Sequence, residues 1–121
     1  MAQILVVDDS STVRDEVAGF LKKSGLDVAT AVDGRDGLAK LKMDPKIKLI
    51  VSDVNMPNMD GLTMAEKIRS ELGNKTVNIV MLTTESGVDK KTAGREAGAT
   101  GWMVKPFKPE ELLSVVKRLI G

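Results

Sequence analysis

Three aspartates follow short apolar runs and could together bind a cation. Asp8 and Asp9 come directly after the run Ile4 to Val7, and Asp53 lies just beyond the run Leu49 to Val51. Crowded carboxylates repel one another at neutral pH unless a cation or a proton separates them. Carboxylate oxygens are hard ligands, and Mg²⁺ accepts a few of them while keeping water and positions for phosphate oxygens. If the fold brings the three together, they predict a Mg²⁺ site.

Two further residues would complement a phosphoryl group beside such a metal. Thr83 follows the run Ile79 to Leu82, and Lys105 follows the run Trp102 to Val104. An ionised Asp53 can attack phosphorus and form an acyl phosphate, while Mg²⁺ and the Lys105 ammonium neutralise charge on the equatorial oxygens. Thr83 can donate a hydrogen bond to one of these oxygens. A side-chain base is not needed, because a carboxylate is already deprotonated at pH 7.

Each of these residues also has a purely structural interpretation. Asp8 and Asp9 could cap a following helix, and Asp53 could cap a loop. Thr83 is of the β-branched type that is common in strands. Lys105 could serve only as the ion-pair partner of a buried carboxylate. A structural ion-pair cluster is the strongest alternative for the whole set, but three acids against one lysine leave charge that a bound cation explains better.

The composition excludes several other chemistries. The 121 residues include no Cys and no His, which excludes thiol nucleophiles, thiolate or histidine zinc sites and Ser-His-Asp triads. Lys and Arg total 18 against 17 Asp and Glu, and the chain has two Phe, one Trp and no Tyr, so nothing indicates nucleic-acid binding. The apolar runs are too short to cross a membrane, and no signal peptide is recognisable. We therefore expect a cytoplasmic protein that binds neither nucleic acid nor membrane.

The elements that must position these residues alternate along the chain. Apolar runs rich in β-branched residues predict five strands, at Ile4 to Val7, Val28 to Ala31, Leu49 to Val51, Ile79 to Leu82 and Trp102 to Val104. Helical spacing predicts a helix after each strand, marked by Val13 to Leu21, Leu38 and Leu41, Ala65 to Leu72, Val88 to Ala97, and the segment from Pro109 onward. We expect the third helix to end near Gly73 and Asn74. The alternation implies a five-stranded (βα)5 parallel sheet with both faces covered, whose carboxyl strand ends share one edge.

At this point the residues resemble a known family. Asp8-Asp9, Asp53 within the segment 52–61 (SDVNMPNMDG), Thr83 and Lys105-Pro106-Phe107 together resemble the response-regulator receiver domain, most of all its single-domain chemotaxis type. The resemblance spans nearly the whole chain. It implies a flavodoxin-like, doubly wound α/β fold with strand order 2-1-3-4-5. It also implies that residues 1–121 form one receiver domain with no output domain.

The resemblance assigns roles around the acceptor. It implies that Asp53 takes a phosphoryl group from the phosphohistidine of a chemotaxis-type histidine kinase. Asp9 and Asp53 would coordinate Mg²⁺, and Asp8 would hold a metal-bound water. The backbone carbonyl of Asn55 would complete the metal site. The chain would catalyse only its own phosphorylation and dephosphorylation, and so would be a signalling switch rather than an enzyme with an external substrate.

The resemblance also implies a switch. Thr83 and Lys105 would bind the phosphoryl oxygens, and the Lys105-Pro106 bond would be cis. Thr83 would move toward the phosphoryl group while the aromatic residue three positions before the lysine turns inward. Trp102 holds that position, where the family usually has Tyr or Phe. A tryptophan that simply packs on the last strand is the alternative. The output surface would be the face of the fourth helix, fifth strand and fifth helix.

The partners follow from the same resemblance. Asn55 and Glu85 resemble the pair that modulates dephosphorylation in the chemotaxis type, although both are also ordinary loop residues. The monomeric chain would receive phosphate from the kinase and bind the flagellar motor switch protein or another downstream protein, with a phosphatase as a further partner. A single-domain phosphorelay intermediate and a phosphate-independent pseudo-receiver that acts as a binding module are the alternatives.

Two other functional classes fit the motifs poorly. Phosphatases of the haloacid dehalogenase type carry an Asp-x-Asp motif after the first strand, whereas this chain has Asp8-Asp9. A nucleotide or flavin binder of this fold class would carry a phosphate-cradling loop. Neither G-x-G-x-x-G nor G-x-x-x-x-G-K-[ST] follows a strand here.

Overall fold

The structure, a computed structural model, describes residues 3–84 and 87–120. The strands are β1 (Ile4–Val7), β2 (Val28–Ala31), β3 (Leu49–Ser52), β4 (Asn78–Thr83) and β5 (Gly101–Val104). The helices are α1 (Ser11–Lys23), α2 (Gly34–Met43), α3 (Gly61–Ser70), α4 (Val88–Glu96) and α5 (Pro109–Ile120). None of the helices in the described part of the chain is long and apolar enough to cross a membrane.

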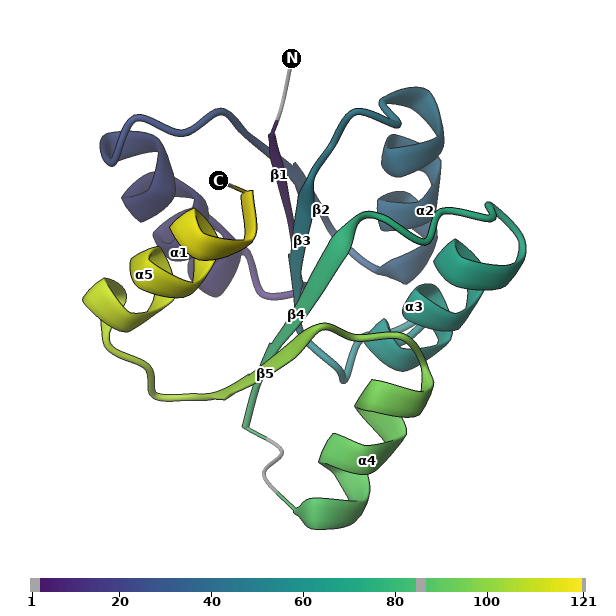
Figure 1. The fold of residues 1–121 in the computed structure, drawn as a ribbon. Helices are drawn as coiled ribbons and strands as arrows, with labels where there is room; N and C mark the ends of the chain where they lie inside the picture. Colours follow the sequence, from purple (N-terminus) through teal and green to yellow (C-terminus); the bar gives the residue numbers. More distant parts are fainter. Residues whose placement is uncertain (1–2, 85–86, 121) are drawn as a thin grey trace.

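The strands form one parallel sheet in the order β2-β1-β3-β4-β5, with β1 near its centre (Figure 1). This confirms the doubly wound fold and the strand order expected from the resemblance. Val7 at the end of β1 lies opposite Ser52 at the end of β3. The residues that follow these two strands therefore leave the sheet at the same level, which places Asp8 beside Asp53.

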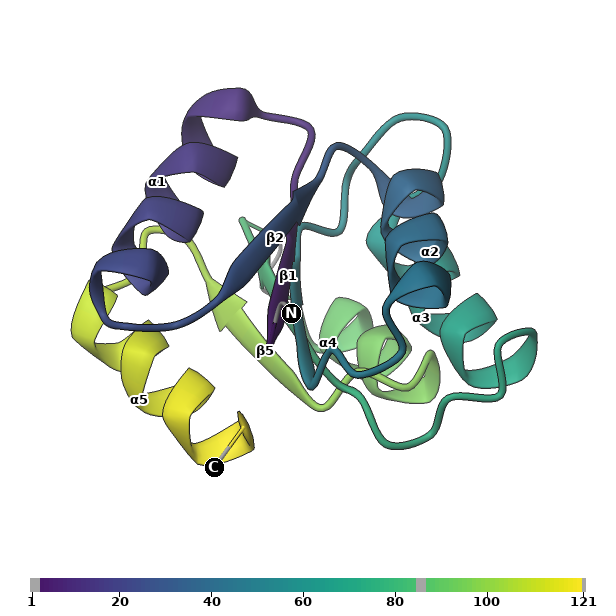
Figure 2. The same cartoon turned by 90° about the horizontal axis from the view of Figure 1, so that it is seen from above.

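Helices cover both faces of the sheet. Figure 2 shows α1 and α5 on one side and α2, α3 and α4 on the other. In β1, Ile4 and Val6 belong to the core beneath α1 and α5, whereas Leu5 and Val7 belong to the core on the opposite face. All four are buried. The sequence of a strand with both faces buried is an unbroken apolar run, because successive side chains point to opposite faces.

The C-terminal end of α3 differs from the sequence prediction. The helix ends at Ser70, several residues before Gly73 and Asn74. The backbone N–H of Leu72 donates to the carbonyl of Lys67 at 3.0 Å, and Gly73 then adopts a left-handed φ of 64°. Leu72 still packs against the core, so its apolar character extended the helical pattern beyond the helix itself.

The two helices beside β5 are anchored very differently. In α5, Leu112 and Val116 are fully buried. Among the nine residues of α4, all of them described, Gly94 is the buried one. The N-cap residue of α4 is Gly87, whose hydrogen atom in place of a side chain provides no cap hydrogen bond. Side-chain packing therefore holds α4 much less firmly than α5.

Candidate functional site

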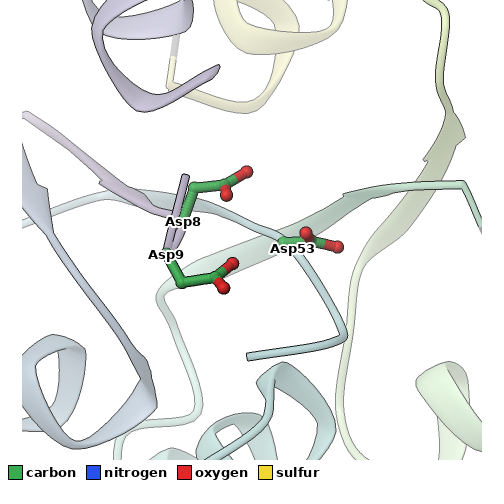
Figure 3. Close-up of side chains that lie close together, drawn as sticks. All are labelled: Asp8, Asp9 and Asp53. Carbon is green, nitrogen blue, oxygen red and sulfur yellow. The ribbon is translucent and has the colours of Figure 1, made fainter. Parts of the chain in front are cut away.

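The site lies where β1 and β3 end. The backbone N–H of Asp8 donates to the carbonyl of Ala31 at 3.1 Å, and that of Asp53 donates to the carbonyl of Val7 at 3.0 Å. These bonds continue the sheet ladder by one residue and fix both aspartates at its edge. Asp9 joins them, and carboxylate oxygens of the three residues lie within 4.8 Å of one another (Figure 3). The structure thus brings together the three carboxylates that the sequence singled out.

Asp8 is the buried member of this group, at 4% exposed. Its Oδ1 accepts the backbone N–H of Ser10 at 2.9 Å. Burial raises the pKa of Asp8 above its ordinary value, and the charge of Asp53 raises it further. The Ser10 N–H and the Lys105 ammonium lower the pKa but offset burial only in part. An ionised Asp8 is therefore incompletely compensated by the protein alone.

Lys105 reaches across the sheet to two of the carboxylates. Its Nζ lies 3.3 Å from Asp8 Oδ2 and 3.5 Å from Asp53 Oδ2. The Lys105-Pro106 bond is cis, as the resemblance predicted. The backbone N–H of Lys105 donates to the carbonyl of Thr83 at 2.8 Å, so the ends of β4 and β5 are held side by side. The ammonium group is thus fixed between two carboxylates that come from different strands.

The remaining predicted residues lie at different depths around this centre. Thr83 is fully buried at the end of β4, and Asn55 is exposed in the loop after β3. Trp102 is half-buried on β5 and packs against the core beneath α3 and α4. A Cβ added at Gly94 would lie 2.7 Å from Cζ3 of this indole, so α4 approaches Trp102 closely. Glu85 lies outside the described residues.

Sequence reasoning missed two residues that shape the site. Arg14 on α1 donates from Nη1 to the backbone carbonyl of Asp8 at 2.8 Å. Gly61 begins α3 where a Cβ would lie 2.2 Å from the carbonyl oxygen of Asp53, so no side chain fits there. The Arg14 contact leaves no pattern in the sequence. The glycine that ends the segment 52–61 was a usable signal, because close backbone approach requires glycine.

The donor set fits Mg²⁺. Asp8, Asp9 and Asp53 offer carboxylate oxygens, which are the ligands that this hard cation prefers. The exposed position of Asp9 leaves room for the waters that Mg²⁺ retains. Because burial raises the pKa of Asp8, positive charge added beside this carboxylate would stabilise its ionised form. The residues present are therefore suited to a divalent cation beside the Lys105 ammonium.

This fold and this acidic edge define a receiver module, and comparison with known proteins gives the same result. Residues 4–117 match the response regulator receiver domain family. The chain belongs to that family.

Its relatives include single-domain chemotaxis proteins. The chain is 37% identical to the chemotaxis protein CheY1 of Helicobacter pylori over 120 residues, which cover 98% of this chain and 97% of that protein. It is 38% identical to Protein PilG of Pseudomonas aeruginosa over 115 residues, covering 95% and 84% of the two chains. The solved structure of the Vibrio cholerae chemotaxis protein CheY4 superposes with a TM-score of 0.90 at 45% identity and covers 98% of both chains. The chain is thus a receiver domain of the kind found in CheY-like response regulators, which are signalling switches rather than enzymes acting on an external substrate.

Proposed function

We propose that the chain is a phosphorylation-controlled switch whose phosphoacceptor is Asp53. The observation that carries this proposal is the position of the Lys105 ammonium, 3.3 Å from Asp8 and 3.5 Å from Asp53. A cation at this place pairs with the acceptor carboxylate before reaction and can pair with a phosphoryl oxygen afterwards. Membership of the receiver family supports the same role.

The donor in this proposal is the phosphohistidine of a chemotaxis-type histidine kinase. An oxygen of the ionised Asp53 carboxylate forms a bond to phosphorus as the phosphorus–nitrogen bond breaks. The imidazole nitrogen keeps the electron pair of that bond and takes up a proton from solvent. Lys105 neutralises charge on the transferred group, and the Thr83 hydroxyl donates to one of its oxygens.

Mg²⁺ would be held by the carboxylates of Asp9 and Asp53 and by the backbone carbonyl of Asn55, with Asp8 acting through a bound water. When bound, it neutralises charge on the phosphoryl oxygens. Asp8 also keeps Lys105 in place through their 3.3 Å ion pair. The acidic cluster, the oxygen-only donor set and the family support this assignment.

The switch would act on its partner through the surface formed by α4, β5 and α5. Trp102 on β5 lies between two surface hollows on this face, one that also involves Lys91 and Arg95 of α4 and one that also involves Val115 and Arg118 of α5. The weak anchoring of α4 gives this face an element that can shift when Thr83 engages the phosphoryl group. Phosphorylation would then favour one arrangement of the face, and a partner that prefers it would bind more tightly.

The partner in this proposal is the flagellar motor switch protein or another downstream protein, bound by a monomer in the cytoplasm. Names of relatives such as CheY1 support a chemotaxis role. Asn55 is exposed beside the acceptor, where it could modulate hydrolysis of the acyl phosphate with or without a phosphatase. That Glu85 acts together with Asn55 in this hydrolysis stays a prediction from the sequence.

The decisive test is the intact mass of the protein after incubation with acetyl phosphate, with and without Mg²⁺. We expect a Mg²⁺-dependent phosphoryl adduct that is lost in Asp53→Asn. The matched control is Asp60→Asn, in the same loop. The Asp60 carboxylate caps α3 by accepting the backbone N–H of Thr63. Asparagine preserves that cap, so uptake should be retained. Absence of an adduct in the wild type would indicate a phosphate-independent binding module instead.

A second variant tests the coupling to output. Lys105→Ala should still accept some phosphate on Asp53, but phosphorylation should no longer change the fluorescence of Trp102 or the binding of a partner. The reason is that the ammonium contacts the acceptor while the backbone of Lys105 directly follows β5. An unchanged, phosphate-dependent fluorescence response in Lys105→Ala would refute this role for the lysine.

A further inference from the structure

The loop that follows β3 carries the acceptor and then turns back to α3. Its two ends are fixed by backbone hydrogen bonds. Asp53 N–H donates to the carbonyl of Val7 at 3.0 Å, and Gly61 N–H donates to the carbonyl of Val54 at 2.9 Å. Between them, Met56 and Met59 pack partly buried against the core, whereas Asn55, the proposed carbonyl ligand, and Asn58 are exposed. Something outside the loop must hold this stretch if Asn55 is to keep one position.

Asp33 supplies that contact from the start of α2. Its Oδ1 accepts the backbone N–H of Asp36 at 2.9 Å, which caps the helix. Its Oδ2 accepts a hydrogen bond from Nδ2 of Asn58 at 2.8 Å. Asp33 is buried, at 8% exposed, and belongs to a different connection of the fold from Asn58. A single carboxylate therefore ends one loop, starts a helix and holds a second loop.

The backbone repeats this contact one residue further along each segment. Gly34 N–H donates to the carbonyl of Met59 at 3.0 Å. A Cβ at Gly34 would lie 2.6 Å from the same oxygen, which is too close for any side chain. Asn58 has a left-handed φ of 67°, a conformation that asparagine tolerates better than most residues. The side-chain and backbone contacts together hold the outer part of the loop against α2.

We propose that Asp33 and Asn58 are positioning residues for the phosphoacceptor site, which hold the loop that carries Asn55 and thereby set the affinity of the site for Mg²⁺. This inference rests on the proposed function, in which Asn55 contributes a ligand. A loop that is already ordered does not lose conformational entropy when the ion binds. A loop freed from α2 must be ordered by the ion itself, so the affinity falls while the ligands stay the same.

Variants can separate this role from simple stability. Asn58→Gly keeps the left-handed backbone available and removes the amide. Asp33→Ser keeps a good N-cap for α2 but cannot reach Asn58. The matched control is Asp36→Asn, in the first turn of the same helix, whose side chain accepts from Val32 and does not contact the loop. Titration calorimetry with Mg²⁺ should show affinity weakened about threefold to tenfold in the first two variants and unchanged in the control.

The rate of phosphate uptake from acetyl phosphate provides a second test of this role. At limiting Mg²⁺ the two variants should be slower than the wild type, and at saturating Mg²⁺ they should match it. A merely structural defect would lower uptake at both concentrations. Uptake that stays slow at saturating Mg²⁺, or a Mg²⁺ affinity equal to that of the wild type, would overturn the inference.

An exchange of the two residues makes the test sharper. Asn58→Asp places a second carboxylate against Asp33 and should weaken Mg²⁺ binding most. The double variant Asp33→Asn with Asn58→Asp restores an amide–carboxylate hydrogen bond with the roles reversed, and asparagine still caps α2. It should recover most of the lost affinity, and failure to recover would count against the inference. If the wild type itself neither binds Mg²⁺ nor takes phosphate, the proposed function falls as well. Normal wild-type behaviour with unaffected variants overturns the inference alone.

Discussion

Asp8 and Asp33 are both buried carboxylates that follow a strand at the same edge of the sheet, yet their pKa values shift in opposite directions. The pKa of Asp33 is lowered, mainly because the backbone N–H of Asp36 and then the amide of Asn58 donate to its ionised form. The pKa of Asp8 is raised, mainly by burial and in part by the charge of Asp53. Both side chains are largely covered from solvent, but burial outweighs the hydrogen bonds at Asp8, whereas the hydrogen bonds outweigh burial at Asp33.

The difference lies in where each carboxylate finds the donors or charges that compensate its ionised form. Asp33 has its donors within the protein, so ionisation at neutral pH stabilises the fold. Asp8 faces two further carboxylates and shares one ammonium with Asp53, so its ionisation is fully favourable only when more positive charge is added. The ionised form of Asp8 would therefore gain from an added cation, whereas that of Asp33 already has its donors within the protein.

The largest expected effect comes from adding Mg²⁺, which supplies positive charge beside Asp8. At a Mg²⁺ concentration about 100 times the dissociation constant, the free energy of unfolding should rise by about 2.7 kcal/mol, because the ion binds only the folded state. Asp8→Asn should lose at least half of this rise. Urea unfolding at pH 7 with and without Mg²⁺ measures both. An equal rise in Asp8→Asn would show that Asp8 does not contribute to the site.

The next effect concerns Asp33. Asp33→Ala removes the cap of α2 and the partner of Asn58 together, and should lower the free energy of unfolding by about 1–3 kcal/mol in the absence of Mg²⁺. Asp33→Asn is the control, because its amide still caps the helix, and it should lose clearly less. Urea unfolding at pH 7 is again the measurement. A loss in Asp33→Ala no greater than in Asp33→Asn would contradict a structural role for the carboxylate.

The part of the site that could be predicted is the part that the topology dictates. In a parallel sheet the strand ends share one edge, so residues such as Asp8, Asp53 and Lys105 were expected to meet once the strands had been recognised. The strand order came from the family resemblance, since periodicity indicates strands without ordering them. Even the weakly periodic α4 was predicted at nearly its observed position, Val88–Glu96.

The contacts that could not be predicted depend on the path of loops. The bond between Asp33 and Asn58 joins this loop to the start of α2, and nothing in the sequence pattern indicates that these two segments meet. The approach of Gly94 to Trp102 depends on how α4 lies against β5. Such contacts join segments that are distant in sequence, and neither residue alone indicates its partner.

A smaller effect, opposite in sign to that of Asp33→Ala, is expected at Asp8. Without Mg²⁺ at pH 7, Asp8→Asn should raise the melting temperature by a few degrees, because it removes a buried charge that its surroundings do not fully compensate. The amide oxygen can still accept the Ser10 N–H, and Lys105 keeps Asp53 as its partner. Thermal unfolding in a chelator-containing buffer is the measurement. A fall in melting temperature would mean that the ion pair with Lys105 outweighs burial.

The smallest effect is the pH dependence of the stability difference between Asp8→Asn and the wild type. Because the folded-state pKa of Asp8 lies above its ordinary value of 3.8, its contribution to stability is fully present below that value and is lost as the pH rises through the folded-state pKa. For Asp33 the sign is reversed: the contribution is present above 3.8 and is lost as the pH falls through its lowered pKa. Lowering the pH from 7 toward 4 without Mg²⁺ should therefore narrow the advantage of Asp8→Asn over the wild type, while the deficit of Asp33→Ala persists until more acidic conditions. Urea unfolding of the three proteins at several pH values tests this, and parallel curves for wild type and Asp8→Asn would contradict the raised pKa.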